Sequence, residues 1–405
     1  MKILLLCNKS PYPALEGGPM AMNSIVTGLL EAGHQVKILA VNSKKYNVTI
    51  DDIPEDYRQK TGIELIDVDL RVKPFQAFKN LFSKKSYHVE RFISKDFTKR
   101  LIEVLQADTY DVVQLETLFM TPYVETIRQY SKAVIVLRAH NVEHLIWERI
   151  AKGTRFFLKR AYIKHLARTL KNYELTAVSQ VDGIAAITRK DAAYFRKYCA
   201  TTTIDIPFGV YPEDYTPSYG IDGKPSFYHL GSMNWIPNEE GIRWFIDNCL
   251  DSVKAKVPNF VFHLAGRNMP DWLKELNDPH VDVVGEVPDA KAFVASHNVA
   301  IVPLLSGSGI RIKIIESMAM GKTVITTMVG AEGILYDEDV NVIIAENKAK
   351  MTEAIRRIDE NPAFAVEIGK AARKLVEEVY DNRKITQRLL LFYAQIKPSS
   401  KITFV

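Results

Sequence analysis

The chain has 405 residues, of which 47% are apolar and 25% charged, a composition that excludes disordered and fibrous proteins. Its three cysteines are too few and too far apart for a disulfide framework or a zinc cluster. The net charge of +5 is uneven: residues 1–200 hold 31 Lys+Arg against 21 Asp+Glu, and residues 201–405 hold 22 against 27, so the halves carry +10 and −5. This length and asymmetry favour two domains that meet different partners.

The first eight residues are too short for the apolar core of a signal peptide. No apolar run approaches the roughly 18 residues that span a bilayer. We therefore expect a cytoplasmic protein, either soluble or peripheral at the inner face of the cell membrane.

The N-terminal pattern predicts a strand, a helix and a second strand. The strands are Lys2–Cys7 and Gln35–Val41, and the helix runs from position 19 or 20 to about 32. The chain lacks G-x-G-x-x-G after the first strand, which disfavours a nicotinamide oxidoreductase. Gly17 and Gly18 form either a plain turn or a loop that lets a phosphate or a sugar approach the backbone.

Four further strands complete the predicted first domain, at Ile63–Val68, Val112–Glu116, Ala133–Ala139 and Val181–Ile187. His140 directly follows one of them, at the carboxyl edge where ligand sites of α/β proteins occur. It is either a structural histidine or a donor to a sugar hydroxyl or phosphate.

Two segments are strongly basic. Residues 71–100 interleave cations with aromatic side chains, and residues 149–171 hold eight Lys+Arg without any Asp or Glu. The second segment predicts one basic amphipathic helix. Each segment is either a solvated face of the core or a surface for an anionic membrane or lipid phosphate. No nucleic-acid reading module accompanies the charge, so nucleic acid is not an expected partner.

Proline and glycine mark residues 211–225 as a linker to a second domain. We expect domains at 1–210 and 226–380, followed by a C-terminal helix at 381–405. In the second domain, loops follow strands at 227–230, 260–265 and 281–284, and Asn238 is expected to cap a helix.

The most informative stretch is residues 306–326, which predicts a Gly-rich loop, a helix from Ile310 to Met320 and a strand. A helix N-terminus favours an anion, whereas Arg311 and Lys313 place cations there. A negatively charged ligand opposite Arg311 and Lys313 would explain these two cations. Glu316 could accept hydrogen bonds from sugar hydroxyls. Together they suggest a nucleotide sugar, and the alternative is a solvated Lys313–Glu316 ion pair.

This stretch resembles the donor-binding signature of retaining GT-B glycosyltransferases of family 4, in the subgroup with G-x-G-x-R-x-K-x-x-E-A-M-A-x-G. Glu316 matches the last glutamate of the E-x(7)-E motif, which holds the donor ribose, and Ser308 stands in place of the first. The resemblance extends to the Gly-Gly loop and to the H-N-x-E segment that begins at His140. It implies an α/β protein of two doubly wound Rossmann-like domains facing a cleft, the first for the acceptor and the second for the donor. The C-terminal helix would cross back onto the first domain.

The resemblance also implies the site residues. The catalytic group would be His140, Arg311, Lys313 and Glu316. The donor-binding group would be Gly17, Gly18, Gly231, Asn234, Gly266, Arg267, Val287, Ser308, Gly309 and Ile310. No metal or other cofactor is expected, because cations would take a metal's place at the diphosphate.

The implied reaction is transfer of a hexosyl group from an NDP-sugar to a saccharide or lipid-linked acceptor, with retention, in envelope polysaccharide or glycolipid synthesis. Two alternatives stay open. A non-hydrolysing NDP-sugar epimerase would release a free NDP-sugar without an acceptor, and a non-catalytic nucleotide-sugar binder or membrane-surface protein would show no turnover.

Overall fold

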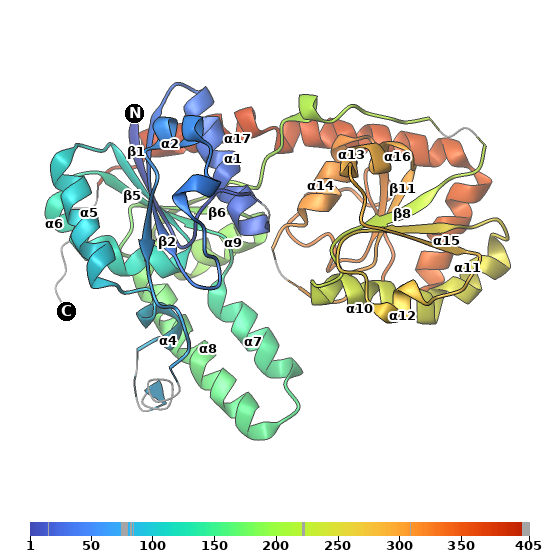
Figure 1. The fold of residues 1–405 in the computed structure, drawn as a ribbon, viewed down its shortest axis with the longest axis horizontal. Helices are drawn as coiled ribbons and strands as arrows, with labels where there is room; N and C mark the ends of the chain where they lie inside the picture. The colour runs from blue at the N-terminus through green and yellow to red at the C-terminus, as the bar shows by residue number, and fades with distance from the viewer. Residues whose placement is uncertain are drawn as a thin grey trace. The chain divides into compact units, whose positions relative to one another are not determined.

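The computed structural model describes residues 1–14, 16–73, 80–81, 83, 85–220, 223–307 and 309–398. The chain forms two compact units (Figure 1). Unit 1 comprises Met1–Gly209 and the segment from Ile385 onward, and unit 2 comprises Val210–Lys384. Each unit is built on one parallel β-sheet.

Unit 1 holds a seven-stranded sheet in the order β3-β2-β1-β4-β5-β6-β7, with all neighbours parallel. Its strands are β1 Lys2–Cys7, β2 Gln35–Asn42, β3 Glu64–Asp67, β4 Val112–Glu116, β5 Val134–Ala139, β6 Gly183–Ala186 and β7 Thr202–Asp205. Its helices are α1 Gly17–Glu31, η1 Ile50–Asp52, α2 Glu55–Thr61, α4 Tyr87–Glu90, α5 Lys95–Ala107, η2 Leu118–Tyr123, α6 Val124–Tyr130, α7 Glu143–Gly153, α8 Phe157–Ala177 and α9 Arg189–Tyr198.

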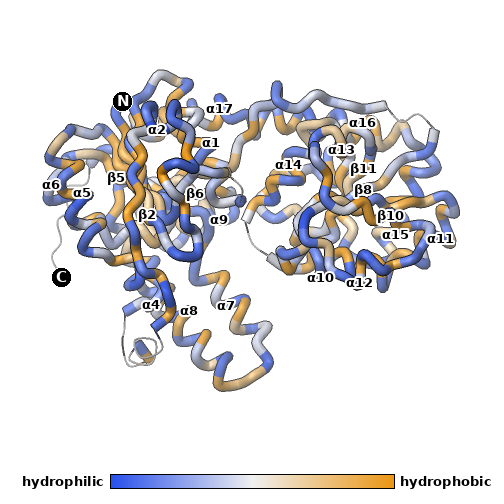
Figure 2. Tube along the Cα trace, viewed as in Figure 1, coloured by the Kyte–Doolittle hydropathy of each residue, from blue (hydrophilic) through white to orange (hydrophobic). Residues whose placement is uncertain are grey.

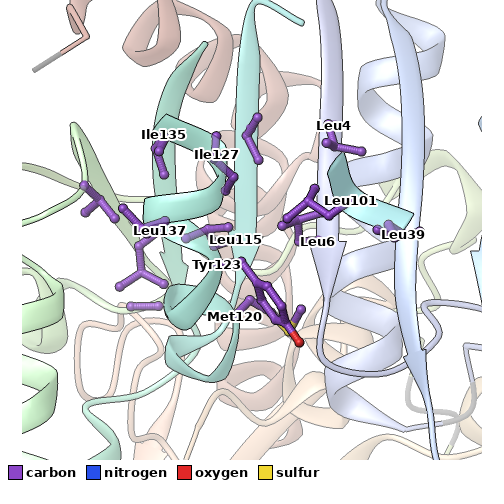
Figure 3. Packing of buried hydrophobic residues seen from close by; sticks show 14 of the residues in the cluster. Leu4, Leu6, Leu39, Leu101, Leu115, Met120, Tyr123, Ile127, Ile135 and Leu137 are labelled. Carbon is purple, nitrogen blue, oxygen red and sulfur yellow. The ribbon is translucent and has the colours of Figure 1, made fainter. Parts of the chain in front are cut away.

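The core of unit 1 lies on both faces of the sheet, because successive side chains of a strand point to opposite faces. Leu4 and Leu6 of β1 belong to one buried cluster with Leu101 of α5 and Ile127 of α6, as Figure 3 shows. Ile3, Leu5 and Cys7 face the other way, into a cluster with α1 and the C-terminal helix. Coverage of both faces explains why the strands are apolar throughout.

Unit 2 holds a six-stranded parallel sheet in the order β10-β9-β8-β11-β12-β13. Its strands are β8 Phe227–Leu230, β9 Phe262–Ala265, β10 Val281–Gly285, β11 Val299–Val302, β12 Thr323–Thr326 and β13 Ile343–Ile344. Its helices are η3 Pro212–Asp214, α10 Ile236–Trp244, η4 Phe245–Cys249, α11 Leu250–Lys256, α12 Asp271–Lys274, α13 Ala290–Ala295, α14 Ile312–Ala319, α15 Lys348–Glu360, α16 Pro362–Leu375 and η5 Val376–Tyr380. The sheet strands are largely apolar in both units (orange in Figure 2).

The helix α17, Asn382–Gln395, begins in unit 2 and continues into unit 1. Its residues Ile385, Leu389 and Phe392 are buried in the unit 1 core. Gly183 of β6 leaves room for this helix, because a Cβ there would lie 2.7 Å from Cζ of Phe392. The core on one face of the first sheet is therefore completed by a helix that follows unit 2 in the chain.

The structure corrects two predictions in unit 1. The sheet does not end at Val181–Ile187, because β7 follows it as an edge strand. The half-exposed strand Thr202–Asp205 has only one strongly apolar residue, Ile204, so it lacks the pattern of a core strand. The single basic helix over 149–171 is instead part of a helical hairpin, since α7 ends at Gly153 and Thr154 adopts an extended conformation.

A third correction concerns Asn238, which does not cap a helix. The helix α10 begins at Ile236, with Pro237 in its first turn. Proline suits that position because it needs no intrahelical donor there. Asn238 is consequently inside the helix, where its side chain is buried.

Among the described residues, none of the helices combines the length and apolar character needed to cross a bilayer. The same residues contain no cluster of three or more metal-ligating side chains. Independence from a metal stays a prediction.

A buried glycine provides a test of the packing in unit 2. We expect Gly369→Ala to destabilise the protein by about 1–3 kcal/mol, because a Cβ on α16 would lie 2.1 Å from the carbonyl oxygen of Gly321. The matched control is Gly153→Ala, which meets no atom within 4 Å at the end of another helix. Urea denaturation of the full chain measures the stability of both variants. Equal midpoints for Gly369→Ala and Gly153→Ala would contradict the packing argument.

Candidate functional site

The carboxyl ends of the unit 2 strands carry three loops that hydrogen-bond to one another. Gly231 after β8 donates its N–H to the carbonyl of Ala265 at 3.0 Å, and Gly266 donates to Gly285 at 2.7 Å. Gly266 has φ +148°, and a Cβ there would lie 1.9 Å from the Gly231 carbonyl oxygen. Only glycine permits this approach, so the loops form one layer of backbone at the sheet edge.

Beneath this layer lies Lys313, in the first turn of α14. Its Nζ donates to Oδ1 of Asn238 at 2.6 Å and lies 3.1 Å from Nε2 of His229. His229 Nδ1 is 2.8 Å from the carbonyl of Ile301, so Nδ1 is the protonated nitrogen and Nε2 accepts from Lys313. Gly231 covers the ammonium, because a Cβ on it would lie 3.0 Å from Nζ.

Burial shifts the titration of both basic groups. Burial and the charge of Lys313 hold the pKa of His229 well below its usual range, so the imidazole is neutral. Burial and the neighbouring Arg311 lower the pKa of Lys313 to about 7. Desolvation therefore makes the charged form of Lys313 less favourable in this cluster, and a bound anion would stabilise that charged form.

Glu316 lies one turn further along α14 and accepts a hydrogen bond from the Tyr215 hydroxyl at 3.0 Å. Burial raises the pKa of Glu316, opposed by the Tyr215 hydrogen bond. In the part of the chain that the structure describes, Glu316 and Lys313 bond to these other partners, so the predicted alternative of a solvated ion pair between them is not formed.

A cavity of about 160 Å³ joins the two side chains. Lys313, Glu316, Tyr215 and Lys291 contribute its polar groups, and β8, β11 and α13 supply apolar walls. This volume is well above the roughly 10–15 Å³ that one water molecule needs. The cavity therefore presents a cation and a carboxylate to a small polar group.

Arg311 supports the Gly-rich loop. It is buried just before α14, and its Nη1 donates to the Gly309 carbonyl at 2.6 Å. Its guanidinium lies 5.4 Å from the centre of the Trp235 ring. Gly307 and Gly309 have φ of +112° and +81°, which other residues rarely adopt. Ile310 follows them, half-buried, and Ser308 lies outside the described residues.

The remaining predicted donor residues of unit 2 lie on the loops at the same edge. Asn234 is exposed, and its Oδ1 accepts from Ser232 Oγ at 2.9 Å. Arg267 has an exposed side chain, and its carbonyl accepts from Met233 N at 2.9 Å. Val287 is half-buried after β10, and a second cavity of about 420 Å³ opens between Gly266 and Glu286.

In unit 1, His140 belongs to a buried cluster of charged residues. Its Nε2 lies 2.6 Å from Oε2 of Glu116, the last residue of β4. Arg138 Nη1 lies 3.2 Å from the same carboxylate oxygen. The side chains of Glu116 and Arg138 are 0% exposed and that of His140 is 10% exposed, so only the histidine reaches the surface.

Burial raises the pKa of Glu116, but Arg138 and the hydrogen bond from His140 outweigh it and hold the pKa below its usual value. Burial lowers the pKa of His140, with Glu116 opposing. The carboxylate therefore holds a neutral imidazole in a fixed orientation.

Gly17 and Gly18 are the first two residues of α1. Arg138 ties this helix to the histidine cluster, because its Nη1 also donates to the carbonyl of Ala21 at 3.1 Å. Arg138 therefore links His140 to the helix that begins with Gly17 and Gly18. Of the predicted residues of unit 2, Gly231 and Glu316 lie beside Lys313 or share its cavity.

Sequence reasoning missed the part that five residues play in these clusters: Glu116, Arg138, Tyr215, His229 and Asn238. Three of them carried a signal. Glu116, Arg138 and His229 are polar residues within strands that are largely buried and apolar. A buried polar group needs a partner, so each marked a network.

The fold is GT-B, the two-domain architecture of a large class of glycosyltransferases. Sucrose-phosphate synthase from Thermosynechococcus elongatus is similar in structure, with a TM-score of 0.68, 16% identity, and 98% of this chain and 99% of that chain covered. A protein of Anabaena, HepE, solved in complex with UDP, has a TM-score of 0.66 at 13% identity, with 97% and 100% covered. These similarities confirm the predicted pair of Rossmann-like domains.

Residues 224–361, within unit 2, match the model of the family described as glycosyl transferases group 1. A relative over nearly the full length is an uncharacterized 44.6 kDa protein in the cps region of Klebsiella pneumoniae, 20% identical over 393 residues, or 95% of this chain and 97% of the relative. In sequence, unit 2 thus resembles a family of glycosyltransferases, and the whole chain shares the GT-B fold.

Proposed function

We propose that this protein is a retaining glycosyltransferase that moves a hexosyl group from an NDP-sugar to a saccharide or lipid-linked acceptor. The observation that carries the proposal is the pair Lys313 and Glu316, one helical turn apart on α14 and lining one cavity. A cation in the first turn of a helix suits a diphosphate, and a carboxylate beside it suits the ribose hydroxyls. Retention is proposed from the family resemblance.

The residues of unit 2 would stabilise the leaving group. As the glycosidic bond breaks, negative charge grows on the diphosphate, where protonated Lys313 and the N-terminus of α14 would stabilise it. Arg311 contributes charge and holds the loop through Gly309. Glu316 orients the donor through its ribose. No metal is required in this scheme, because the cations are supplied by the protein.

Unit 1 would contribute His140 to orient the donor sugar, and Gly17 and Gly18 would offer backbone N–H groups at the start of α1. Glu116 acts as a positioning residue, since it fixes the imidazole at 2.6 Å. Exclusion of water from the donor site would suppress hydrolysis.

The relatives suggest where to look for substrates. HepE of Anabaena was solved with UDP and with UDP-glucose, so uracil is the first base to test. The Klebsiella pneumoniae relative lies in a cps region, which favours envelope polysaccharide or glycolipid synthesis. We place the protein in the cytoplasm, at the inner face of the membrane, with segments 71–100 and 149–171 as its candidate contacts. Residues 74–79, 82 and 84 of the first segment lie outside the described residues.

Thermal shift against NDPs and NDP-sugars, without added metal, tests the donor site. A ligand at 100 times its Kd should stabilise the protein by about 2.7 kcal/mol. We expect a rise for one NDP-sugar and its NDP. Glu316→Ala should abolish the rise, whereas Glu367→Ala, an exposed glutamate of α16, should leave it unchanged.

No rise with any nucleotide would contradict the donor site. Chromatography of the products then distinguishes the reactions. Release of NDP with a glycosylated acceptor supports the transferase, and conversion of the NDP-sugar to its epimer without NDP release supports the epimerase.

A further inference from the structure

The hairpin of α7 and α8 projects from the sheet of unit 1 (Figure 1). Near the sheet it is packed, with Leu170 and Ala177 of α8 buried against Val89 and Leu118. His88 stacks on Trp147 of α7 at 4.0 Å between ring centres. This half of the hairpin is a structural part of the unit.

The far end of the hairpin is different. Arg155 to Ala161 are all exposed, and they include Phe156, Phe157 and Leu158, which are 60%, 63% and 58% exposed. The two aromatic rings lie 5.6 Å apart between centres. A contiguous exposed apolar patch is costly for a soluble protein and marks an interaction surface.

The charges at this end also oppose stability. Lys159 and Arg160 occupy the first turn of α8, which has no acidic residue, so cations face the positive end of the helix dipole. Within the described ranges, no ion pair joins either cation, or Arg155, to a carboxylate. Apolar rings and misplaced cations at one tip are together explained by an anionic surface with an apolar interior.

One side of the hairpin adds a basic groove of about 350 Å³ between the two helices. Its charged lining residues are Lys152, Lys164, Arg168, Lys171 and Glu148. In the described part of the chain, none of these four cations forms an ion pair. The groove therefore offers a net positive site beside the apolar tip.

We propose that the α7–α8 hairpin is a membrane anchor for anionic lipid. Phe156, Phe157 and Leu158 enter the headgroup and acyl boundary, and the tip and groove cations bind lipid phosphates. Bilayers match this surface because they combine negative headgroups with an apolar layer. The biological role of this anchor rests on the proposed lipid-linked acceptor. Its test requires neither a donor sugar nor turnover.

The hairpin is also joined to the candidate site. The carboxylate of Glu174 on α8 accepts the backbone N–H groups of Glu143 at 2.9 Å and His144 at 3.2 Å, in the first turn of α7. That turn begins three residues after His140. Docking of the tip would thus hold the histidine loop at a fixed height above the lipid, one length of α7 or ~16 Å away.

Co-sedimentation of the full chain with vesicles tests the anchor. We expect binding to phosphatidylcholine vesicles with 30% phosphatidylglycerol, and little binding to phosphatidylcholine alone. Phe156→Ser with Phe157→Ser should weaken binding by at least tenfold. Lys164→Gln with Arg168→Gln should weaken it by about fivefold for each cation removed. The substituted residues are exposed, so the fold should survive.

Matched controls are Val340→Ser, which is 54% exposed in unit 2, and Lys350→Gln with Lys370→Gln, which are exposed on α15 and α16. They should bind vesicles like the unaltered chain. The anchor would be overturned if the tip variant, Phe156→Ser with Phe157→Ser, bound anionic vesicles as well as the unaltered chain does. It would also be overturned if the unaltered chain showed no preference for anionic vesicles. Self-association that the tip variant abolishes, without vesicle binding, would overturn it in favour of a contact between copies.

Donor binding is measured separately on the same variants. The tip and groove variants should keep the thermal shift with the nucleotide. Vesicle binding without any nucleotide shift would refute the proposed transferase and leave the anchor standing, so the two failures are distinguishable.

Discussion

Replacing Lys313 with methionine should lower glycosyl transfer by about 100-fold or more, because one preorganised group at a developing charge contributes that much in other enzymes. Methionine has a similar length without the charge, so packing on α14 is largely kept. We expect the thermal shift with NDP to disappear in the same variant. Lys350→Met, on exposed α15, is the control and should retain full activity.

The pH dependence of binding sharpens this test. The pKa of Lys313 is about 7 in the free protein, and a bound diphosphate would raise it. The protonated form binds the anion, so affinity should be highest below pH 7 and decline above it, by up to about tenfold per pH unit. Calorimetric titration between pH 6 and 9 measures the profile. If the affinity of Lys313→Met fell with pH as steeply as that of the unaltered chain, the pH dependence would belong to another group.

The second large effect is expected at Arg138, whose role is in folding. Arg138→Met should reduce the free energy of unfolding by about 3–5 kcal/mol, because it leaves the carboxylate of Glu116 buried without its cation. His140→Gln should change stability little and lower turnover by about 100-fold, since the histidine lies at the surface of the cluster. Urea denaturation and a transfer assay measure the two quantities.

A double substitution checks the reason for the Arg138 effect. Glu116→Leu with Arg138→Met removes both charges, so it should be more stable than Arg138→Met alone. If the double variant is the less stable of the two, the cost of Arg138→Met comes from lost packing and not from an isolated charge.

The apolar pattern was enough to predict most of the two sheets. Runs such as Lys2–Cys7 and Val112–Glu116 are strands in the structure because both faces of each sheet are covered. The edge strand β7 escaped prediction because a half-exposed strand has no apolar run. The break after Gly153 escaped because the charge pattern continues through it.

The candidate site was accessible from sequence only in part. The Gly-rich loop and α14 are local, so Lys313 and Glu316 could be placed one turn apart. Their partners could not, because Asn238 and Tyr215 lie 75 and 101 residues away along the chain. Arg311 shows the same limit: its position was predicted, but its contacts with Gly309 and Trp235 depend on loop conformation.

The path of α17 imposes an order on biosynthesis. Ile385, Leu389 and Phe392 fill one face of the first sheet, yet the ribosome adds them after all of unit 2. During translation α1 can cover only part of that face, so the rest stays open, while unit 2 can close on residues already made. We therefore expect the N-terminal half of the nascent chain to depend on chaperones until its final helix leaves the exit tunnel.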